Sequence, residues 1–230
     1  MEKIVILTGA GISAESGLST FRDQGGLWAQ YRIEDVATPE GFARDPALVQ
    51  GFYNARRLNA ATKQPNAAHH ALARLQRESA GEVIVVTQNV DCLHEAGGAT
   101  DVIHMHGTLA GALCSTCGHR WPAPDEMAVD EPCPACNAPT ARPDVVWFGE
   151  MPYFMDQIFE HLASASVFAA IGTSGQVYPA AAFVHEARAA GARTVEINLE
   201  ATGDAFDDRL LGKATETVPV WVDRLLTQQS

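Results

Sequence analysis

The chain has 230 residues and a mass of 24.6 kDa, enough for one well-filled core and a small second unit without disulfide bonds. Its content of 47% hydrophobic and 19% charged residues excludes intrinsic disorder, and no apolar run reaches the roughly 18 residues of a membrane span. The net charge of −12 argues against non-specific binding to nucleic acid, and we expect a cytoplasmic monomer that binds neither nucleic acid nor membranes.

Short runs rich in valine and isoleucine alternate with helical stretches along the chain. Strands are expected at residues 4–8, 82–87, 102–105, 167–171 and 194–197. Helices are expected at about 46–61, 66–78, 152–163, 180–191 and 204–211. Continuous apolar strands that alternate with helices predict an α/β fold, in which helices cover both faces of a parallel sheet.

Two stretches interrupt this alternation. Residues 24–65 contain no strand candidate, and residues 108–142 are rich in cysteine, proline and glycine. We interpret both as insertions into the sheet domain, and we expect them to form a second, smaller domain together.

A glycine-rich turn follows the first expected strand. Gly9, Gly11 and Ala14 fit the pattern G-x-G-x-x-A, in which glycines let the backbone approach a pyrophosphate at the start of the next helix. An ordinary tight turn is the alternative. A dehydrogenase would carry an acidic residue about 20 positions further on, at the end of a second strand. Glu34 and Asp35 have that spacing, but no strand leads into them, so hydride transfer is disfavoured.

The expected helix at 46–61 carries a tyrosine and an arginine three positions apart. Tyr53 and Arg56 therefore share one face of the helix. A hydroxyl and a guanidinium together fit a carboxylate, whereas a surface pair in which the arginine stem packs on the ring is the alternative. Arg57 points elsewhere on the helix and is given no role.

Polar residues follow the expected strand at 82–87, and a histidine ends the next one. Gln88, Asn89 and Asp91 form the polar cluster, and His106 precedes Gly107. Ligands bind at the carboxyl edge of parallel sheets, so these groups predict a site there, although any one of them is also compatible with a simple turn. Four histidines fall in expected helices and are interpreted as structural or surface residues: His69, His70, His161 and His185. Two others, His94 and His104, have no evident partner in the sequence.

Four of the five cysteines form two close pairs, Cys114-x-x-Cys117 and Cys133-x-x-Cys136, separated by 15 residues. Two knuckles of this spacing predict a tetrahedral site of four thiolates for one structural Zn²⁺, with no vacant position for a catalytic water. The remaining thiol, Cys92, is interpreted as a buried small residue rather than a nucleophile.

Further motifs complete an ordered set along the chain. The set consists of Gly9-Ala10-Gly11-Ile12-Ser13, Thr20-Phe21-Arg22, Thr87-Gln88-Asn89-Val90-Asp91, His106-Gly107, the four cysteines, Phe148-Gly149-Glu150, Gly172-Thr173-Ser174 and Asn198-Leu199-Glu200. Together these motifs resemble those of the sirtuins, a family of NAD-dependent protein-lysine deacylases. The resemblance runs from about residue 4 to residue 220 and includes no departure in the core motifs.

The resemblance implies a Rossmann-like NAD-binding domain formed by residues 1–23, 66–107 and 143–230. The small domain would comprise 24–65 and 108–142, as a helical module and a zinc ribbon. NAD would be a co-substrate. Its pyrophosphate would lie at Gly9, Ala10, Gly11, Ile12 and Ser13, a covering loop would include Phe21 and Arg22, and its nicotinamide ribose would lie at Gln88, Asn89 and Asp91. Gly172, Thr173 and Ser174 would contact it at a later strand end, Asn198, Leu199 and Glu200 would lie near the adenosine ribose, and Ala214 would lie by the adenine.

The resemblance also implies a catalytic and a substrate-binding group. In this family the acyl oxygen attacks the carbon that loses nicotinamide, and His106 would then activate a ribose hydroxyl to attack the resulting imidate. Neutral imidazole suits this role because its ordinary pKa is about 6.5. Residues Val145 to Gly149, including Phe148, would pair as a strand with a protein substrate that carries the acylated lysine.

The Tyr-x-x-Arg pattern is similar to the bacterial sirtuin class that removes succinyl and malonyl groups. Tyr53 and Arg56 would then bind the acyl carboxylate, and Ala37 would leave room for the longer chain. The expected activity is therefore deacetylation and desuccinylation. Two alternatives stay open: an enzyme that is mainly a deacetylase, and a zinc-ribbon binding module that uses NAD as a regulatory ligand. The charge of −12 and the presence of His106 count against the binding module.

Overall fold

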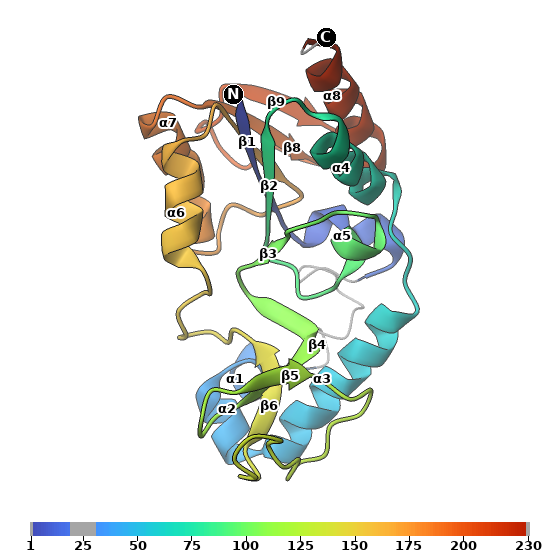
Figure 1. Ribbon diagram of the computed structural model, residues 1–230, viewed down its shortest axis with the longest axis vertical. Coiled ribbons are helices and arrows are strands. Elements are labelled where there is room, and N and C mark those ends of the chain that lie inside the picture. The colour runs from blue at the N-terminus through green and yellow to red at the C-terminus, as the bar shows by residue number, and fades with distance from the viewer. Residues whose placement is uncertain (1, 19–30, 229–230) are drawn as a thin grey trace.

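A six-stranded parallel sheet forms the larger part of the protein. The computed structural model describes residues 2–18 and 31–228, and its sheet has the strand order β3-β2-β1-β7-β8-β9 (Figure 1). The strands are β1 (Lys3–Thr8), β2 (Glu82–Thr87), β3 (Ile103–His104), β7 (Val167–Ile171), β8 (Arg193–Asn198) and β9 (Asp208–Leu211). The chain moves outward from β1 in both directions, which is the order of a Rossmann-like sheet.

Helices cover both faces of this sheet, which confirms the predicted fold class. On β1, Ile4 and Ile6 pack in one apolar cluster, whereas Val5 and Leu7 pack in another on the opposite face. Alternation along a strand sends neighbouring side chains to opposite faces, so a continuous apolar run fills two cores. The first face is covered by α4 (Ala67–Glu78) and α8 (Ala214–Gln228), and the second by α6 (Met155–Ala163) and α7 (Phe183–Ala189).

A second sheet and three helices lie at the other end of the molecule (Figure 1). The antiparallel strands are β4 (Gly107–Cys114), β5 (Arg120–Pro122) and β6 (Ala141–Val145), in the order β5-β4-β6. The helices are α1 (Ile33–Val36), α2 (Pro39–Arg44) and α3 (Pro46–Ala61). Residues 31–65 contain no strand, as expected for this described part of the first insertion. The exact domain boundaries stay a prediction.

The expected helix at 204–211 is wrong, because residues 208–211 form the edge strand β9. Val195 of β8 pairs with Asp208, and Leu210 packs against the core whereas Leu211 is 54% exposed. This alternation is typical of a strand that is buried on one side. The C-terminal helix α8 was not predicted from the sequence, and it carries Pro219 in its interior. Among the described residues, no helix combines the length and apolar character needed to cross a membrane.

Candidate active site

The glycine turn after β1 packs directly against the turn after β7. The main-chain N–H of Gly11 donates to the oxygen of Gly172 at 2.8 Å, and a Cβ on Gly11 would lie 2.7 Å from the Gly172 Cα. A Cβ on Gly9 would lie 2.8 Å from the Gly172 oxygen. Both positions must therefore be glycine, because any side chain would overlap the turn that follows β7. The helix expected after this turn is absent from residues 10–16, which form two short 3-10 turns instead.

Polar side chains from four strand ends meet at the carboxyl edge of the sheet. Asn89 Nδ2 donates to Ser13 Oγ at 3.1 Å, and both residues are buried. Gln88 Nε2 donates to Thr173 Oγ1 at 3.0 Å, and Asn198 Nδ2 donates to the Thr173 oxygen at 2.8 Å. Residues far apart in sequence thus form one connected polar edge, as the motif positions predicted.

Asp91 and the other predicted ligand residues of this edge differ in exposure. Asp91 is buried and accepts from the Leu93 N–H at 3.1 Å, and burial raises the pKa of its carboxyl. Leu199 is 66% exposed, and Ala214, at the start of α8, is buried. Glu200 is exposed, and Ala10, Gly172 and Ser174 are half-buried. Phe21 and Arg22 lie outside the described residues.

His106 follows β3 and is held in one tautomer. Its Nδ1 lies 3.0 Å from the main-chain oxygen of Gln88. Because a carbonyl oxygen only accepts, Nδ1 carries the proton and Nε2 keeps its lone pair. Burial lowers the pKa of the imidazole below its ordinary value of 6.5. His106 is therefore a neutral base at pH 7.

His104, for which the sequence showed no evident partner, contacts both Glu95 and the backbone of Asn89 in the polar edge. Its Nε2 lies 2.7 Å from Glu95 Oε1, and its Nδ1 lies 3.2 Å from the Asn89 oxygen. Both partners are acceptors, so the protonated ring can donate from both nitrogens at once. Burial lowers the pKa of His104, but Glu95 outweighs this effect and holds it above 6.5. His104 ends β3 and His106 lies in the turn that follows, so no local pattern marks His104 as a partner of Glu95.

His94 also has a partner, contrary to expectation. Its Nε2 lies 2.9 Å from Thr8 Oγ1, and its ring meets the ring of His69 with centroids 5.1 Å apart. Burial lowers the pKa of His94 to about 4 and that of His69 to about 3, so both rings are neutral. The two rings thus contact buried hydroxyl groups next to the polar edge, His94 at Thr8 and His69 at Ser13.

Tyr53 and Arg56 lie side by side on α3, as the helical spacing predicted. The Arg56 Cζ is 5.5 Å from the centroid of the Tyr53 ring. Tyr53 is 1% exposed, and its hydroxyl oxygen accepts a hydrogen bond from Trp147 Nε1 at 2.9 Å. Burial lowers the pKa of the Arg56 guanidinium and raises that of the Tyr53 hydroxyl. The sequence analysis missed Trp147, whose partner lies 94 positions away.

Of residues 145–149, which were predicted to pair as a strand with substrate, only Val145 lies in β6, and the segment already forms main-chain hydrogen bonds within the protein. Val145 pairs with Gly107 in the second sheet, and the Val146 N–H donates to the His106 oxygen at 2.9 Å. The Phe148 N–H donates to the oxygen of Ala37 at 2.9 Å, and the Phe148 side chain is 48% exposed. Residues 145–149 therefore connect His106, the candidate catalytic residue, to Ala37, a candidate residue of the acyl site.

Arg57, which was given no role, joins α3 to the second sheet. Its Nε donates to the Leu109 oxygen at 2.7 Å, and its Nη1 donates to Asn54 Oδ1 at 2.8 Å. Asn54 in turn donates from Nδ2 to the Met127 oxygen at 2.9 Å. These buried bonds fix the helix that carries Tyr53, so the role of Arg57 is structural.

The four cysteines of the two pairs converge into one cluster. All four Sγ atoms lie within 4.8 Å of one another, and Cys114–Cys136 and Cys117–Cys133 are each 3.7 Å apart. Zn–S bonds of about 2.3 Å in a tetrahedron place sulfur atoms about 3.8 Å apart, so the cluster fits one Zn²⁺. Cys92 was expected to be buried, and this was wrong, because it is exposed. Partial desolvation and the negative charge of nearby Glu95 raise the pKa of its thiol to about 11.

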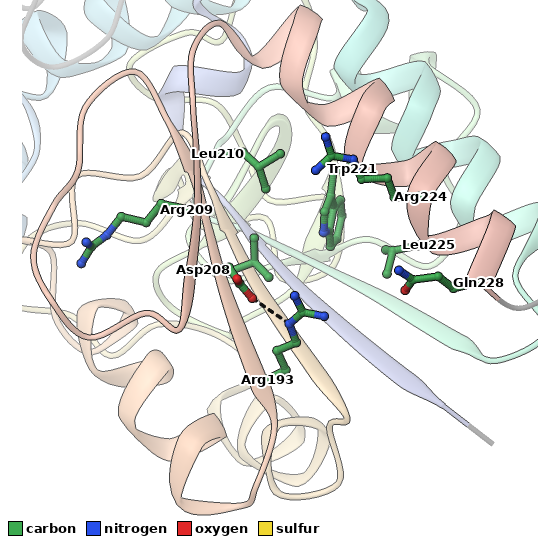
Figure 2. Close-up of a pocket in the computed structure, with 9 residues that line it drawn as sticks. Arg193, Asp208, Arg209, Leu210, Trp221, Arg224, Leu225 and Gln228 are labelled. Carbon is green, nitrogen blue, oxygen red and sulfur yellow. Dashed lines mark hydrogen bonds and ion pairs between the residues drawn. The ribbon is translucent and has the colours of Figure 1, made fainter.

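A surface pocket of about 150 Å³ lies elsewhere, between β8, β9 and α8 (Figure 2). Figure 2 shows Arg193 directed at Asp208, with which it forms an ion pair of 2.7 Å. These residues begin β8 and β9, so the pocket lies beside the amino ends of these strands, whereas the polar edge lies at their carboxyl ends. The pocket is not part of the candidate site.

Comparison with known proteins gives a family match, a similar relative and two similar solved structures. A family model described as "Sir2 family" matches residues 9–179. An "NAD-dependent protein deacylase" of Caulobacter vibrioides is 56% identical over 232 residues, covering 98% of this chain and 98% of the relative. A solved Sir2 homologue in complex with NAD superposes with a TM-score of 0.90 at 38% identity, covering 99% of this chain and 91% of that one. Sir2Af2 bound to a myristoylated histone peptide gives 0.74 at 30% identity, covering 98% and 92%.

Proposed function

The chain belongs to the Sir2 family, and we propose that it is an NAD-dependent protein-lysine deacylase that removes acetyl and succinyl groups, and malonyl groups by the same site. The products would be the free lysine, nicotinamide and O-acyl-ADP-ribose. The name of the Caulobacter relative and the peptide and NAD complexes of the structural neighbours support this activity. Acylated lysine side chains of proteins are the proposed partners, and a cytoplasmic monomer remains part of the proposal.

The polar edge fits NAD by the chemistry of its donors. Ser13, Asn89 and Asp91 are buried polar residues at strand ends, and the turn at Gly9 and Gly11 exposes no Cβ. A dinucleotide needs a close backbone approach at its phosphates and hydrogen-bonding groups at its riboses and amide. NAD supplies the ribose carbon that loses nicotinamide and the hydroxyls that receive the acyl group. The residues that would hold it are those predicted from the sequence, from Gly9 to Ala214.

His106 is the proposed general base, and its tautomer is the observation that carries this proposal. The bond from Nδ1 to the Gln88 oxygen leaves Nε2 unprotonated. Nε2 would accept the proton of a ribose hydroxyl while the Gln88 oxygen stabilises the imidazolium that forms. The lowered pKa of His106 keeps this base neutral at physiological pH.

The four clustered cysteines would hold one structural Zn²⁺. Their four thiolates would occupy every position of a tetrahedral site, which would leave none for substrate or water. Cys114 of this cluster ends β4, whose first residue is Gly107, next to His106. The metal would therefore stabilise the sheet that borders the catalytic residue.

Tyr53 and Arg56 are the proposed ligands of the acyl carboxylate. A guanidinium that is desolvated by burial gains most from a carboxylate partner. Ala37 is small and buried near the Phe148 backbone, which suits a longer acyl chain. The contacts of Arg56 with the rings of Phe52 and Tyr53 favour a second candidate, because they hold the arginine without any acyl carboxylate. That candidate is mainly a deacetylase with weak desuccinylase activity.

Nicotinamide release from an acetylated peptide tests the enzyme directly. We expect release only when NAD and the acylated peptide are both present, with equimolar deacylated peptide and O-acyl-ADP-ribose. NAD binding without peptide-dependent nicotinamide release would instead indicate a binding module.

A further inference from the structure

We propose that Trp147 is a positioning residue for acyl specificity, because its indole N–H orients the Tyr53 hydroxyl toward the carboxylate of a succinylated or malonylated lysine. This inference rests on the proposed function of Tyr53 and Arg56. It adds a residue from the segment after β6 to the two proposed carboxylate ligands, Tyr53 and Arg56, which both lie on α3.

The hydrogen bond between these two residues fixes the direction of the hydroxyl proton. Trp147 Nε1 lies 2.9 Å from the Tyr53 oxygen, and an indole N–H can only donate. The Tyr53 oxygen is therefore the acceptor, and its own proton must point away from Trp147. The two residues are 2% and 1% exposed, so bulk water does not compete for this bond.

The indole is held from its other sides by an ion pair. The Arg142 Cζ lies 3.6 Å from the centroid of the Trp147 ring. Arg142 donates to both carboxylate oxygens of Glu150, at 2.7 and 2.8 Å, and Glu150 accepts from the Trp147 main-chain N–H at 2.7 Å. Phe42 packs on the ring with centroids 5.2 Å apart. Both the backbone and the ring of Trp147 are thus fixed, so its N–H is a rigid donor.

A rigid donor at Tyr53 matters only for an acyl group that carries a charge. A carboxylate bound between the Arg56 guanidinium and the Tyr53 hydroxyl accepts from both groups. If the Tyr53 proton turned toward Trp147, the carboxylate would face an oxygen lone pair instead, and two negative partners would repel. Trp147 excludes that orientation, since two protons would then oppose each other. An acetyl group has no carboxylate and is insensitive to the direction of this proton.

The test uses Trp147→Phe, which removes the N–H and keeps an aromatic ring. We expect kcat/KM on a succinyl-lysine peptide to fall about 3–10-fold, the effect of one oriented neutral hydrogen bond, and kcat/KM on the acetyl peptide to change less than about twofold. Trp221→Phe is the matched control, because Trp221 is also buried but lies in α8 (Figure 2). It should leave the ratio of the two activities unchanged.

A double-mutant cycle with Tyr53→Phe separates this role from general packing. Without the Tyr53 hydroxyl, Trp147→Phe should cause no further loss on the succinyl peptide. Equal losses on both peptides, additive losses in the cycle, or an unchanged succinyl activity would overturn the inference for Trp147 alone. A wild-type enzyme without desuccinylase activity, or an Arg56→Met variant with unchanged succinyl turnover, would overturn the proposed acyl site and this inference together.

Discussion

The Nδ1 atom of His106 lies 3.0 Å from the main-chain oxygen of Gln88, a residue of the polar edge on the neighbouring strand end. One contact therefore sets both the tautomer of the proposed base and its position relative to the residues that would border the nicotinamide ribose. The base cannot move without disturbing Gln88, whose side chain is in turn bonded to Thr173.

Replacing His106 with alanine should lower turnover by about 10²–10⁴, the usual contribution of a positioned general base. The side chain is only half-buried at a strand end, so the melting temperature and NAD affinity should stay near those of the wild type. Nicotinamide release and calorimetric NAD binding measure the two effects. His185→Ala, an exposed histidine on α7, is the control. Near-wild-type deacylation by His106→Ala would remove this residue from the mechanism.

Gly11→Ala should destabilise the fold by about 1–3 kcal/mol, because the added methyl group would overlap the backbone of Gly172. Gly51→Ala is the opposite case, since Gly51 is exposed within α3 and a Cβ there would meet no atom within 4 Å. It should stabilise by about 0.5–1 kcal/mol. Urea unfolding of both variants measures these changes. Equal stability of the two would contradict the close packing of the strand-end turns.

Glu95→Gln should lower the melting temperature in a pH-dependent way. The pKa of His104 is held above 6.5 by Glu95 despite burial, so its stabilising effect is full below that pH and is lost as pH rises through the folded-state value. Burial raises the pKa of Glu95, but His104 outweighs this and lowers it below 4.5, so the contribution of Glu95 is full above 4.5 and is lost as pH falls through its folded-state value.

The difference in melting temperature between wild type and Glu95→Gln should therefore be largest between pH 4.5 and 6.5. A pair worth about 1 kcal/mol corresponds to roughly 2–4 °C in a chain of this size. The gap should narrow toward pH 9. Glu160→Gln, an exposed change on α6, should show no such dependence. A difference in melting temperature that stayed constant from pH 4.5 to pH 9 would exclude an ionised His104–Glu95 pair.

Cys133→Ala should remove zinc and lower both stability and activity, because metal affinity in such sites is also folding free energy. We expect one Zn²⁺ per wild-type chain and a melting temperature at least about 5 °C lower in the variant. Cys92→Ala, which changes an exposed cysteine outside the cluster, should retain zinc and stability. Elemental analysis without zinc, or full activity after verified removal of the metal, would contradict the structural assignment.

The sequence predicted those parts of the fold that local patterns determine. Apolar runs predicted the central strands, and cysteine spacing predicted the cluster, because each depends on residues close together in the chain. The edge strand β9 was missed, since Asp208 and Arg209 interrupt its apolar pattern and only one side is buried. The contacts of His104 with Glu95 and of Trp147 with Tyr53 were missed for another reason. They depend on tertiary packing, which no local pattern encodes.

The most direct test of the proposed acyl site compares kcat/KM of the wild type and Arg56→Met on one peptide that carries acetyl-, malonyl- or succinyl-lysine. Loss of a charge-assisted contact of about 1.5–3 kcal/mol should lower succinyl and malonyl turnover at least 10–100-fold. Acetyl turnover should change little or rise, because acetyl-lysine has no carboxylate to lose its partner. Equal losses on all three peptides would show that Arg56 only holds α3 in place and reads no charge on the substrate.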